Sequence, residues 1–417
     1  MTGRMPLRVC FVSRRFVPAI SGMSVYALNL LHELVAAGHD VTMISQYRTD
    51  AFGTGIYGGG PPPPVPGVRV IGLEATGEQE GPGDFERDVD AMVATIAAEH
   101  AHRPFDILHA QYGYPTGWAV LLASRQLGIP NLVSIQGGDG HWVGSCCETH
   151  RLAMVRVLDH AGAALIGGES FLQEVTERLR VGRDRFVLVP GAVDTTRFRP
   201  ADEAQVGQAA DPVRILYHGR VDRRKGALDL LDALALVAGR GVPFRATVSG
   251  IGPDLEAARE RAVAHGFGPD QVRFTGYADY EAAPALYREA DVFASPTYAE
   301  GFSNTILEAM ASGLAILSCR AVGVVDCLRD GDTALLTEPG DIPAIADGLE
   351  RLIRDTALRT GLASAALAEC RSTYSWQAVG RRIMAVYEGL AGTAPDIGFP
   401  PDLPMTPCRF RAEPHLL

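Results

Sequence analysis

Asp291-Val-Phe-Ala-Ser-Pro-Thr297 and Glu300-Gly-Phe-Ser-Asn-Thr-Ile-Leu-Glu308 are the two segments that decide the fold. The first is short and apolar and ends at a proline, which predicts a strand of a buried sheet. In the second, apolar residues take a helical spacing from Asn304 onward, with Ser303 or Asn304 as the N-cap and Gly313 as the stop signal. A strand, a loop and a helix in succession predict an α/β protein with a parallel sheet.

The second segment also places two carboxylates, Glu300 and Glu308, eight positions apart. The free backbone N–H groups that open its helix would face the mouth of the sheet, where anionic phosphate binds well. Glu308, one turn inside the helix, is placed to accept hydrogen bonds from a ribose, and Glu300 on the loop is free to meet sugar hydroxyls. A helix with two surface acids is the simpler alternative, and Glu308 by itself does not decide between the two.

The segment from Glu300 to Gly313 resembles the E-x7-E segment of the retaining, nucleotide-sugar-dependent glycosyltransferases of family 4. Three further motifs are similar to that family in order and spacing, over about residues 7–390. They are Ser21-Gly-Met23, Gly219-Arg-Val-Asp-Arg-Arg-Lys-Gly226 and Phe274-Thr-Gly-Tyr277. The resemblance implies the GT-B fold, in which two Rossmann-like, doubly wound parallel-sheet domains face a deep cleft.

Composition narrows the classes of protein. The 417 residues suffice for two domains, and 47% hydrophobic with 21% charged residues is typical of a soluble globular protein. A formal charge of −11 argues against nucleic acid as a partner and weakens a role on anionic membranes. No apolar run reaches the length of a transmembrane helix.

The N-terminus and the cysteines favour a cytoplasmic protein. The chain enters the expected strand Leu7-Arg-Val-Cys-Phe-Val12 without the pattern of a signal peptide. The seven cysteines are scattered, and they include the adjacent pair Cys146 and Cys147. Because no C-x2-C spacing indicates a zinc site, we expect reduced thiols and no metal.

Strand and helix signals alternate along two stretches of the chain and predict two domains. A polar segment between them predicts a linker, and the resemblance implies that the last helix crosses back to the first domain. The expected parts are an N-terminal acceptor-binding domain (1–198), a linker (199–212), a nucleotide-sugar-binding domain (213–375), the returning helix (376–392) and a Pro-rich tail (393–417).

Two cations follow the first strand of the second domain. Arg220 and Lys225 can neutralise a diphosphate leaving group, which is the main electrostatic task in glycosyl transfer. Lys225 is the only lysine of the chain, which suggests that a compact ammonium is wanted at this place. An ion pair of Arg220 with Asp222 and an accident of composition are the alternatives.

The resemblance and the motifs together predict a donor site. The residues expected to act in catalysis are Arg220, Lys225, Glu300 and Gln136. Those expected to bind the donor are Gly22, Met23, Gly219, Tyr277, Phe302, Ser303, Asn304, Thr305 and Glu308.

The chain departs from the family pattern at Gln136. The family usually has a His-Gly pair there, and the histidine touches the donor sugar, whereas Gln136 precedes Gly137 in this sequence. Either Gln136 takes the role of that histidine, or it is a loop residue and His141 has taken over the site. An unusual loop follows, and we expect Gln111, Asp139, His141 and Trp142 to bind the acceptor.

A catalytic metal ion is not expected. Asp88-Val-Asp90 has the spelling of the D-x-D motif that holds Mg²⁺ in many inverting transferases. It lies within an acidic helix of the first domain, so we interpret it as a solvated helix face.

The sequence therefore predicts a retaining, metal-independent glycosyltransferase. It would move a hexose-type sugar from a nucleotide donor, UDP-activated by preference, to a small molecule such as a natural product, as a monomer or homodimer. A lipid or polysaccharide acceptor and a nucleotide-sugar epimerase or hydrolase on the same fold stay open. A non-catalytic solute-binding protein would leave Arg220 and Lys225 without a task.

Overall fold

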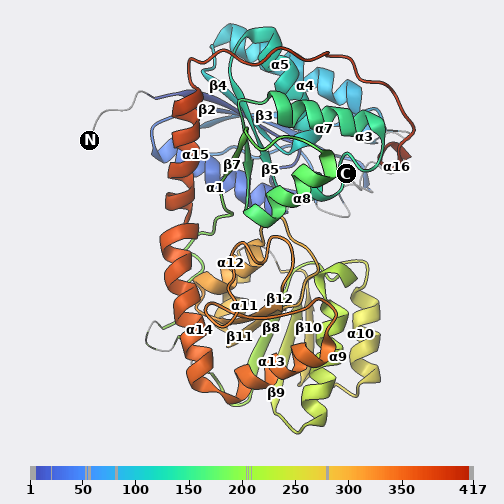
Figure 1. Ribbon diagram of the computed structural model, residues 1–417, viewed down its shortest axis with the longest axis vertical. Helices are drawn as coiled ribbons and strands as arrows, with labels where there is room; N and C mark the ends of the chain where they lie inside the picture. The colour runs from blue at the N-terminus through green and yellow to red at the C-terminus, as the bar shows by residue number, and fades with distance from the viewer. Residues whose placement is uncertain are drawn as a thin grey trace. The chain divides into compact units, whose positions relative to one another are not determined.

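The computed structural model describes residues 6–412 except 20, 52–53, 55–57, 80–82, 203, 205, 208 and 279–280. The chain divides into two compact units (Figure 1). Unit 1 comprises Met1–Pro190 together with Val379–Leu417, and unit 2 comprises Gly191–Ala378.

Unit 1 contains a parallel sheet of seven strands in the order β3-β2-β1-β4-β5-β6-β7. The order reverses between β1 and β4, as in a doubly wound Rossmann fold. Its strands are β1 (Arg8–Ser13), β2 (Asp40–Tyr47), β3 (Val68–Glu74), β4 (Ile107–Gln111), β5 (Asn131–Ile135), β6 (Ala163–Ile166) and β7 (Phe186–Leu188).

Helices follow most strands of unit 1, as parallel crossovers require. They are α1 (Gly22–Ala36), α3 (Thr76–Gln79), α4 (Phe85–His102), η1 (Gly113–Gly117), α5 (Trp118–Leu127), α6 (Gly138–His141), α7 (Glu148–His160), α8 (Glu169–Leu179) and, in the last part of the chain, most of α15 (Trp376–Leu390) and α16 (Arg409–Ala412).

The central strands of unit 1 are buried on both faces. Every residue of β4, β5 and β6 is buried, and only the first residue of β1 is exposed. Strands covered on both faces have continuous apolar runs in their sequence rather than alternating ones, as the expected strand at residues 7–12 does.

Unit 2 contains a second parallel sheet, of six strands in the order β10-β9-β8-β11-β12-β13. Its strands are β8 (Val213–His218), β9 (Phe244–Ser249), β10 (Val272–Gly276), β11 (Val292–Ser295), β12 (Ala315–Cys319) and β13 (Leu335–Thr337). Its helices are η3 (Arg223–Lys225), α9 (Ala227–Gly239), α10 (Leu255–Ala264), α11 (Ala283–Arg288), α12 (Asn304–Ala311), α13 (Ile342–Arg354), α14 (Thr356–Glu369) and η4 (Cys370–Tyr374).

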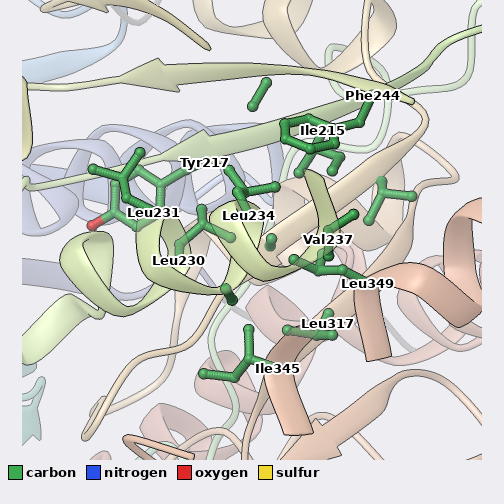
Figure 2. Packing of buried hydrophobic residues seen from close by; sticks show 14 of the residues in the cluster. Ile215, Tyr217, Leu230, Leu231, Leu234, Val237, Phe244, Leu317, Ile345 and Leu349 are labelled. Carbon is green, nitrogen blue, oxygen red and sulfur yellow. The ribbon is translucent and has the colours of Figure 1, made fainter. Parts of the chain in front are cut away.

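Alternate residues of one strand pack into different cores of unit 2. In β8, Ile215 and Tyr217 join a cluster with Leu231 and Leu234 of α9, as Figure 2 shows. Leu216, between them, belongs to a second cluster with residues of α12 on the opposite face. Because successive strand side chains point to opposite faces, both faces of the sheet are covered. The predicted fold class, GT-B with two Rossmann-like sheets, is confirmed.

The boundary between the units differs from the one expected from the sequence. The expected linker, residues 199–212, belongs to unit 2. Phe198 is buried in the second core of that unit, against Tyr287. At the other end the division falls within α15, so the residues of this helix from Val379 onward group with unit 1. A polar composition alone did not reveal these packing contacts.

The tail after α15 is attached to unit 1. Figure 1 shows it running from α15 past α5 and α7 to α16. Phe399 is buried against Trp118 of α5, and Arg411 forms a bidentate ion pair with Glu86 of α4 at 2.7 and 2.6 Å. No helix in the described part of the chain is both long and apolar enough to span a bilayer.

Candidate active site

The motifs of unit 2 meet at the point where its strand order reverses. Strands β8 and β11 are neighbours in the sheet, although β9 and β10 lie between them in the sequence. The loop after β8 carries Arg220 and Lys225, and the loop after β11 carries Glu300. In open α/β sheets ligands bind at this switch point, outside the carboxyl ends of the strands.

Two glycines let the loop after β11 pack closely against its neighbours, Gly226 in the loop after β8 and Gly323 in the loop after β12. Gly226, at a φ of 73°, lies against the loop after β11 so closely that a Cβ would stand 2.0 Å from the carbonyl oxygen of Pro296. Gly323 has a φ of 76°, and a Cβ there would lie 2.1 Å from the carbonyl oxygen of Glu300. Any other residue at either place would meet backbone and a strained conformation, so the loop packing requires glycine.

The approach of the loops brings Lys225 and Glu300 together. Lys225 Nζ lies 2.8 Å from Glu300 Oε2 and donates to the carbonyl oxygen of Ala299 at 3.2 Å. The lysine side chain keeps 32% of its surface exposed, and that of the glutamate keeps 16%. An ammonium group has three donors, so Lys225 retains one for a ligand.

Arg220 stands at the same edge of the sheet but is held less firmly. Its side chain is 52% exposed, and Nε lies 3.5 Å from Asp222 Oδ2. Asp222 is closer to Arg224, at 3.1 Å, and also caps η3 through the backbone N–H of Arg224. The ion pair proposed as the alternative role of Arg220 therefore exists, but an exposed pair of this length is weak and exchangeable.

Helix α12 begins at Asn304, shortly after Glu300 in the loop that follows β11. Ser303 occupies the N-cap position without a side-chain hydrogen bond to the helix, and its Oγ lies 3.2 Å from Thr305 Oγ1. The first backbone N–H groups of the helix, from Asn304 onward, carry a partial positive charge. Phe302, before the cap, packs against Tyr374, which fixes the entry of the chain into the helix.

Glu308 lies deeper than the sequence suggested. Tyr287 is fully buried, and its hydroxyl donates to Glu308 Oε2 at 2.6 Å. Burial raises the pKa of Glu308 to about 7, although the hydrogen bond from Tyr287 acts in the opposite direction. The interpretation as a simple surface acid is wrong, because the side chain is buried and held by a core tyrosine.

Two further predicted donor residues lie at the ends of neighbouring strands. Gly219 directly follows β8, with a φ of 146° that favours glycine. Tyr277 directly follows β10 and is 52% exposed, which is unusual for a large aromatic side chain.

In unit 1, the predicted phosphate cradle is the start of α1. The helix begins at Gly22, and the N-cap Ser21 accepts a hydrogen bond from the backbone N–H of Ser24 at 3.3 Å. The carbonyl oxygen of Met23 accepts a hydrogen bond from Gln111 Nε2 at 2.9 Å. This contact ties the helix start to the end of β4.

Gln136 belongs to the same network. Gln111 Nε2 donates to Gln136 Oε1 at 2.7 Å, as it does to Met23. Tyr26 of α1 forms side-chain hydrogen bonds with Ser134 and Gln136, while burial raises its pKa to about 12. Gln111 is fully buried and Gln136 half-buried, so Gln111 is a residue that positions Gln136 rather than an exposed acceptor contact.

Asp139 was expected to bind the acceptor, but both of its carboxylate oxygens accept hydrogen bonds from the backbone of the surrounding loops. It is fully buried, and it accepts hydrogen bonds from the backbone N–H groups of Gly113, Gln136 and Gly140 at 2.8–3.0 Å. Burial raises the pKa of its carboxyl to about 6 against the effect of these bonds. Asp139 therefore stabilises the turn that follows β5.

His141 and Trp142 end the short helix α6. His141 Nδ1 lies 2.7 Å from Glu174 Oε1, and its buried Nε2 has no hydrogen-bond partner among the described residues. Trp142 is 42% exposed. Of the predicted acceptor residues, Trp142 therefore has the most exposed side chain, and His141 is buried beside it.

The interpretation of Asp88 and Asp90 as one solvated helix face is wrong for Asp88. Asp90 is exposed, but Asp88 is buried and accepts hydrogen bonds from the backbone N–H groups of Gly77 and Glu78 at 2.9 and 3.0 Å. Burial raises the pKa of Asp88 to about 6. Its oxygens hold the start of α3, a role that the D-x-D spelling does not indicate.

Buried polar residues next to the site were missed in the sequence. His109 of β4 lies between Tyr387 of α15 and Ser134 of β5, with ring nitrogens 2.6 and 2.7 Å from their hydroxyl groups. Burial lowers the pKa of His109 to about 3, so the ring stays neutral. Tyr287, the partner of Glu308, was also missed. Both pairings join residues far apart in the chain, and such a pairing leaves no pattern among neighbouring residues of the sequence.

Comparison with known proteins identifies the family. A family model described as "Glycosyl transferase 4-like domain" matches residues 21–192, and one described as "Glycosyl transferases group 1" matches residues 212–355. The two matches contain the motifs of both units. The chain belongs to the group 1 glycosyltransferases. The family predicted from the four motifs is thereby confirmed, and so is its transferase activity.

Relatives of this glycosyltransferase match it over most of its length. The glycogen synthase of Mycobacterium tuberculosis (strain CDC 1551 / Oshkosh) is 26% identical, over 91% of this chain and 94% of its own. The D-inositol 3-phosphate glycosyltransferase of Arthrobacter sp. (strain FB24) is 27% identical, over 89% and 92%.

Solved structures share the fold of this glycosyltransferase. Sucrose-phosphate synthase from Thermosynechococcus elongatus has a TM-score of 0.71 at 24% identity, and covers 92% of this chain and 99% of its own. HepE of Anabaena in complex with UDP and glucose has a TM-score of 0.69 at 15% identity, covering 92% and 100%.

Proposed function

We propose that this glycosyltransferase transfers a hexose-type sugar from a nucleoside diphosphate donor, UDP-linked by preference, to a small-molecule acceptor in the cytoplasm. The transfer retains the anomeric configuration and uses no catalytic metal ion. The observation that carries the proposal is the meeting of Lys225, Arg220 and the start of α12 at the switch point of unit 2.

The chemistry that these groups supply is stabilisation of a leaving group. As the bond between the anomeric carbon and the diphosphate oxygen breaks, negative charge grows on the diphosphate and positive charge grows on the sugar. Lys225 and Arg220 meet the negative charge, together with the backbone N–H groups that open α12. Two cations and a helix N-terminus at one edge of the sheet can do the work that Mg²⁺ does at other diphosphate sites.

Glu300 has two tasks in this proposal. Its Oε2 holds the Lys225 ammonium in place, which lowers the cost of orienting a flexible side chain in the transition state. Its second oxygen is then available to accept a hydrogen bond from a sugar hydroxyl.

Glu308 and Tyr277 would bind the nucleoside. One oxygen of Glu308 is taken by Tyr287, so the ribose hydroxyls would donate to the other. The exposed ring of Tyr277 at the end of β10 offers a face on which a base can stack.

Retention of configuration is supported by the family resemblance and by the chemistry of the site. Front-face attack lets the departing phosphate accept the proton of the acceptor hydroxyl, so that no enzymic base is needed. The new bond forms between the acceptor oxygen and the anomeric carbon, and the nucleoside diphosphate leaves with the proton. The role of the protein is then positioning and charge stabilisation.

A small-molecule acceptor is favoured over a lipid. The chain carries a formal charge of −11, whereas binding to anionic lipid surfaces uses clusters of basic residues. The exposed ring of Trp142, which lies against His141, offers an aromatic surface suited to an organic acceptor.

The test is incubation of the purified full chain with a panel of nucleotide sugars, with and without a library of small acceptors. Mass spectrometry detects transfer, and NMR gives the anomeric configuration of the product. We expect an acceptor-dependent product with the configuration of the donor. Conversion of the nucleotide sugar without any acceptor would instead indicate an epimerase or a hydrolase, and an inverted product would refute retention.

A further inference from the structure

Three cysteines and one histidine of unit 1 lie close together where the C-terminal tail meets the start of α7. Cys146 and Cys147 precede α7, His150 lies in its first turn, and Cys408 comes from the tail just before α16. One ligand atom from each of these residues lies within 4.8 Å of the other three. Cys146 Sγ and Cys408 Sγ lie 3.2 and 3.4 Å from His150 Nδ1.

These distances approach those of a tetrahedral metal site. With metal–sulfur bonds of about 2.3 Å and metal–nitrogen bonds of about 2.0 Å, ligand atoms stand roughly 3.5–3.8 Å apart. The group therefore needs to adjust by about 1 Å or less at its widest separation. A donor set of three thiolates and one imidazole is soft and suits Zn²⁺, which has no redox chemistry and accepts four such ligands.

Backbone N–H groups meet two of the three sulfur atoms, and a cation lies near the group. Cys147 occupies the N-cap of α7, and its Sγ accepts the backbone N–H of His150 at 3.5 Å. Cys408 Sγ accepts the backbone N–H of Phe410 at 3.4 Å. Backbone donors and a helix N-terminus stabilise a thiolate sulfur. Three thiolates around Zn²⁺ leave one net negative charge, and Arg411 lies close enough to Cys147 to interact with it electrostatically.

The aromatic packing holds the imidazole in place. His150 is fully buried and lies against Tyr114, Phe85 and Phe410, with ring centroids 4.5, 5.8 and 6.2 Å apart. Its Nδ1 faces the sulfur atoms of Cys146 and Cys408, so the ring is oriented for coordination through that nitrogen. A preoriented ligand loses less freedom when a metal binds.

We propose that Cys146, Cys147, His150 and Cys408 bind one Zn²⁺ ion that fastens the C-terminal tail to the start of α7. Four protein ligands leave no open position, so the role of the ion is structural. The site would reinforce the neighbouring tail contacts, in which Thr406 exchanges hydrogen bonds with Thr149 at 2.9–3.2 Å. A zinc ion here departs from the expectation that the cysteines bind no metal. That expectation followed from the lack of a C-x2-C spacing, and a ligand as far along the chain as Cys408 leaves no such spacing.

The first experiment measures metal content. The full chain is purified under reducing conditions from cells grown with added zinc, and bound metal is quantified by inductively coupled plasma mass spectrometry. We expect about one zinc ion per chain. Cys408→Ser and Cys146→Ser should lose most of the zinc, whereas Cys319→Ser, a control in unit 2 whose hydroxyl can still meet Thr337, should keep it. Equal zinc in the wild-type chain and in both ligand variants would overturn the proposal.

The second experiment identifies the metal ligands by absorption spectroscopy of bound Co²⁺. Co²⁺ added to the metal-free wild-type chain should give thiolate-to-cobalt charge-transfer absorption and the visible bands of a tetrahedral ion, and Zn²⁺ should displace it. The charge-transfer band should weaken by about one third in Cys146→Ser if that variant binds cobalt at all, because one of three thiolates is lost. A wild-type chain without a charge-transfer band would overturn the proposal.

The third experiment measures how well zinc protects the C-terminal tail from proteolysis. Trypsin can cut after Arg409 and Arg411, and zinc should protect both bonds in the wild-type chain but not in Cys408→Ser. Intact mass under non-reducing conditions distinguishes the redox alternative. If the isolated chain contains a disulfide between two of these cysteines and no zinc, the group is a redox pair and the zinc proposal is wrong.

Discussion

Lys225 Nζ and Glu300 Oε2 lie 2.8 Å apart, on loops that follow neighbouring strands of one sheet. The pair joins the only lysine of the chain to the first carboxylate of the E-x7-E segment. It also explains why a lysine is needed, because its ammonium can contact Glu300, the carbonyl oxygen of Ala299 and a phosphate together.

Replacement of either cation should weaken the reaction more than it weakens substrate binding. Lys225→Ala and Arg220→Ala should each raise the donor KM and lower kcat, with a loss of about 10²–10³-fold in kcat/KM, because phosphate charge grows in the transition state. Lys225→Arg should restore only part of the activity. Arg223→Ala is the matched control, since Arg223 is an exposed neighbour paired with Asp254. Steady-state kinetics that show unchanged turnover in both alanine variants would contradict the donor-site assignment.

Alanine substitutions of Glu308 and Glu300 should have different effects on nucleotide binding. Glu308→Ala should weaken binding of free UDP, because Glu308 is assigned to the ribose. Glu300→Ala should leave UDP affinity nearly intact and lower kcat, because Glu300 is assigned to the sugar and to Lys225. Isothermal titration calorimetry with UDP measures the first effect and steady-state kinetics the second. Equal losses of UDP affinity in both variants would refute this division.

The buried carboxyl of Glu308 should make stability depend on pH. Burial raises its pKa from 4.5 to about 7 in the folded state. Below pH 4.5 the group is protonated in both states and costs nothing. Between pH 4.5 and about 7 the unfolded chain releases this proton while the folded chain keeps it, so stability falls as the pH rises, by an amount on the order of 3 kcal/mol in all.

Glu308→Gln tests this dependence, because glutamine still accepts a hydrogen bond from Tyr287 and carries no charge. The variant should melt at a higher temperature than the wild-type chain at pH 8 and at nearly the same temperature at pH 4. Glu256→Gln, on the exposed surface of α10, serves as the control and should show no such difference. Thermal unfolding followed by circular dichroism makes the comparison, and a Glu308→Gln effect independent of pH would rule out the buried ionisation.

Gln136 should act through hydrogen bonds that do not titrate. Gln136→Ala removes the acceptor for Gln111 and should cost about 1–3 kcal/mol of transition-state stabilisation. Gln136→His should keep the fold and add a limb to the pH–rate profile between about pH 5 and 8. His141→Ala is the comparison, and a loss of turnover in that variant alone would show that His141, paired with Glu174, has taken over the site.

Catalysis should survive chelation. Brief addition of excess EDTA should leave the initial rate unchanged, because Lys225, Arg220 and the start of α12 supply the positive charge. The proposed zinc site lies in unit 1 and has no part in the chemistry, so its slow depletion would appear in the tail and not in the initial rate. Loss of transfer that Mg²⁺ or Mn²⁺ restores would contradict metal-independent catalysis.

Local patterns in the sequence were enough to predict most elements of secondary structure. The strand expected within 291–297 is β11 (Val292–Ser295), and the helix expected from Asn304 onward is α12 (Asn304–Ala311). Hydrophobic periodicity and helix caps depend on neighbours within a few positions, so one sequence contains that information. The short helices α3 and α6 were missed because four residues do not form a periodic pattern.

The candidate site could be predicted in its residue types but not in its geometry. The motifs placed Arg220, Lys225 and Glu300 at strand ends, and the parallel order of the sheet brought those ends to one edge. The contact between Lys225 and Glu300 depends on Gly226, which lets the loops after β8 and β11 touch, and no spacing in the sequence reports that approach.

The sequence by itself determined the family, the two Rossmann-like sheets and the list of groups able to bind a diphosphate. Only the tertiary structure decided which polar groups are buried with partners, as for Glu308 with Tyr287, and Asp139 with three backbone N–H groups. Only the tertiary structure also brought Cys408 to His150. The physical reason is that strand and helix formation follow from local periodicity, whereas the pairing of buried polar groups depends on strand order and on close packing between segments far apart in the chain.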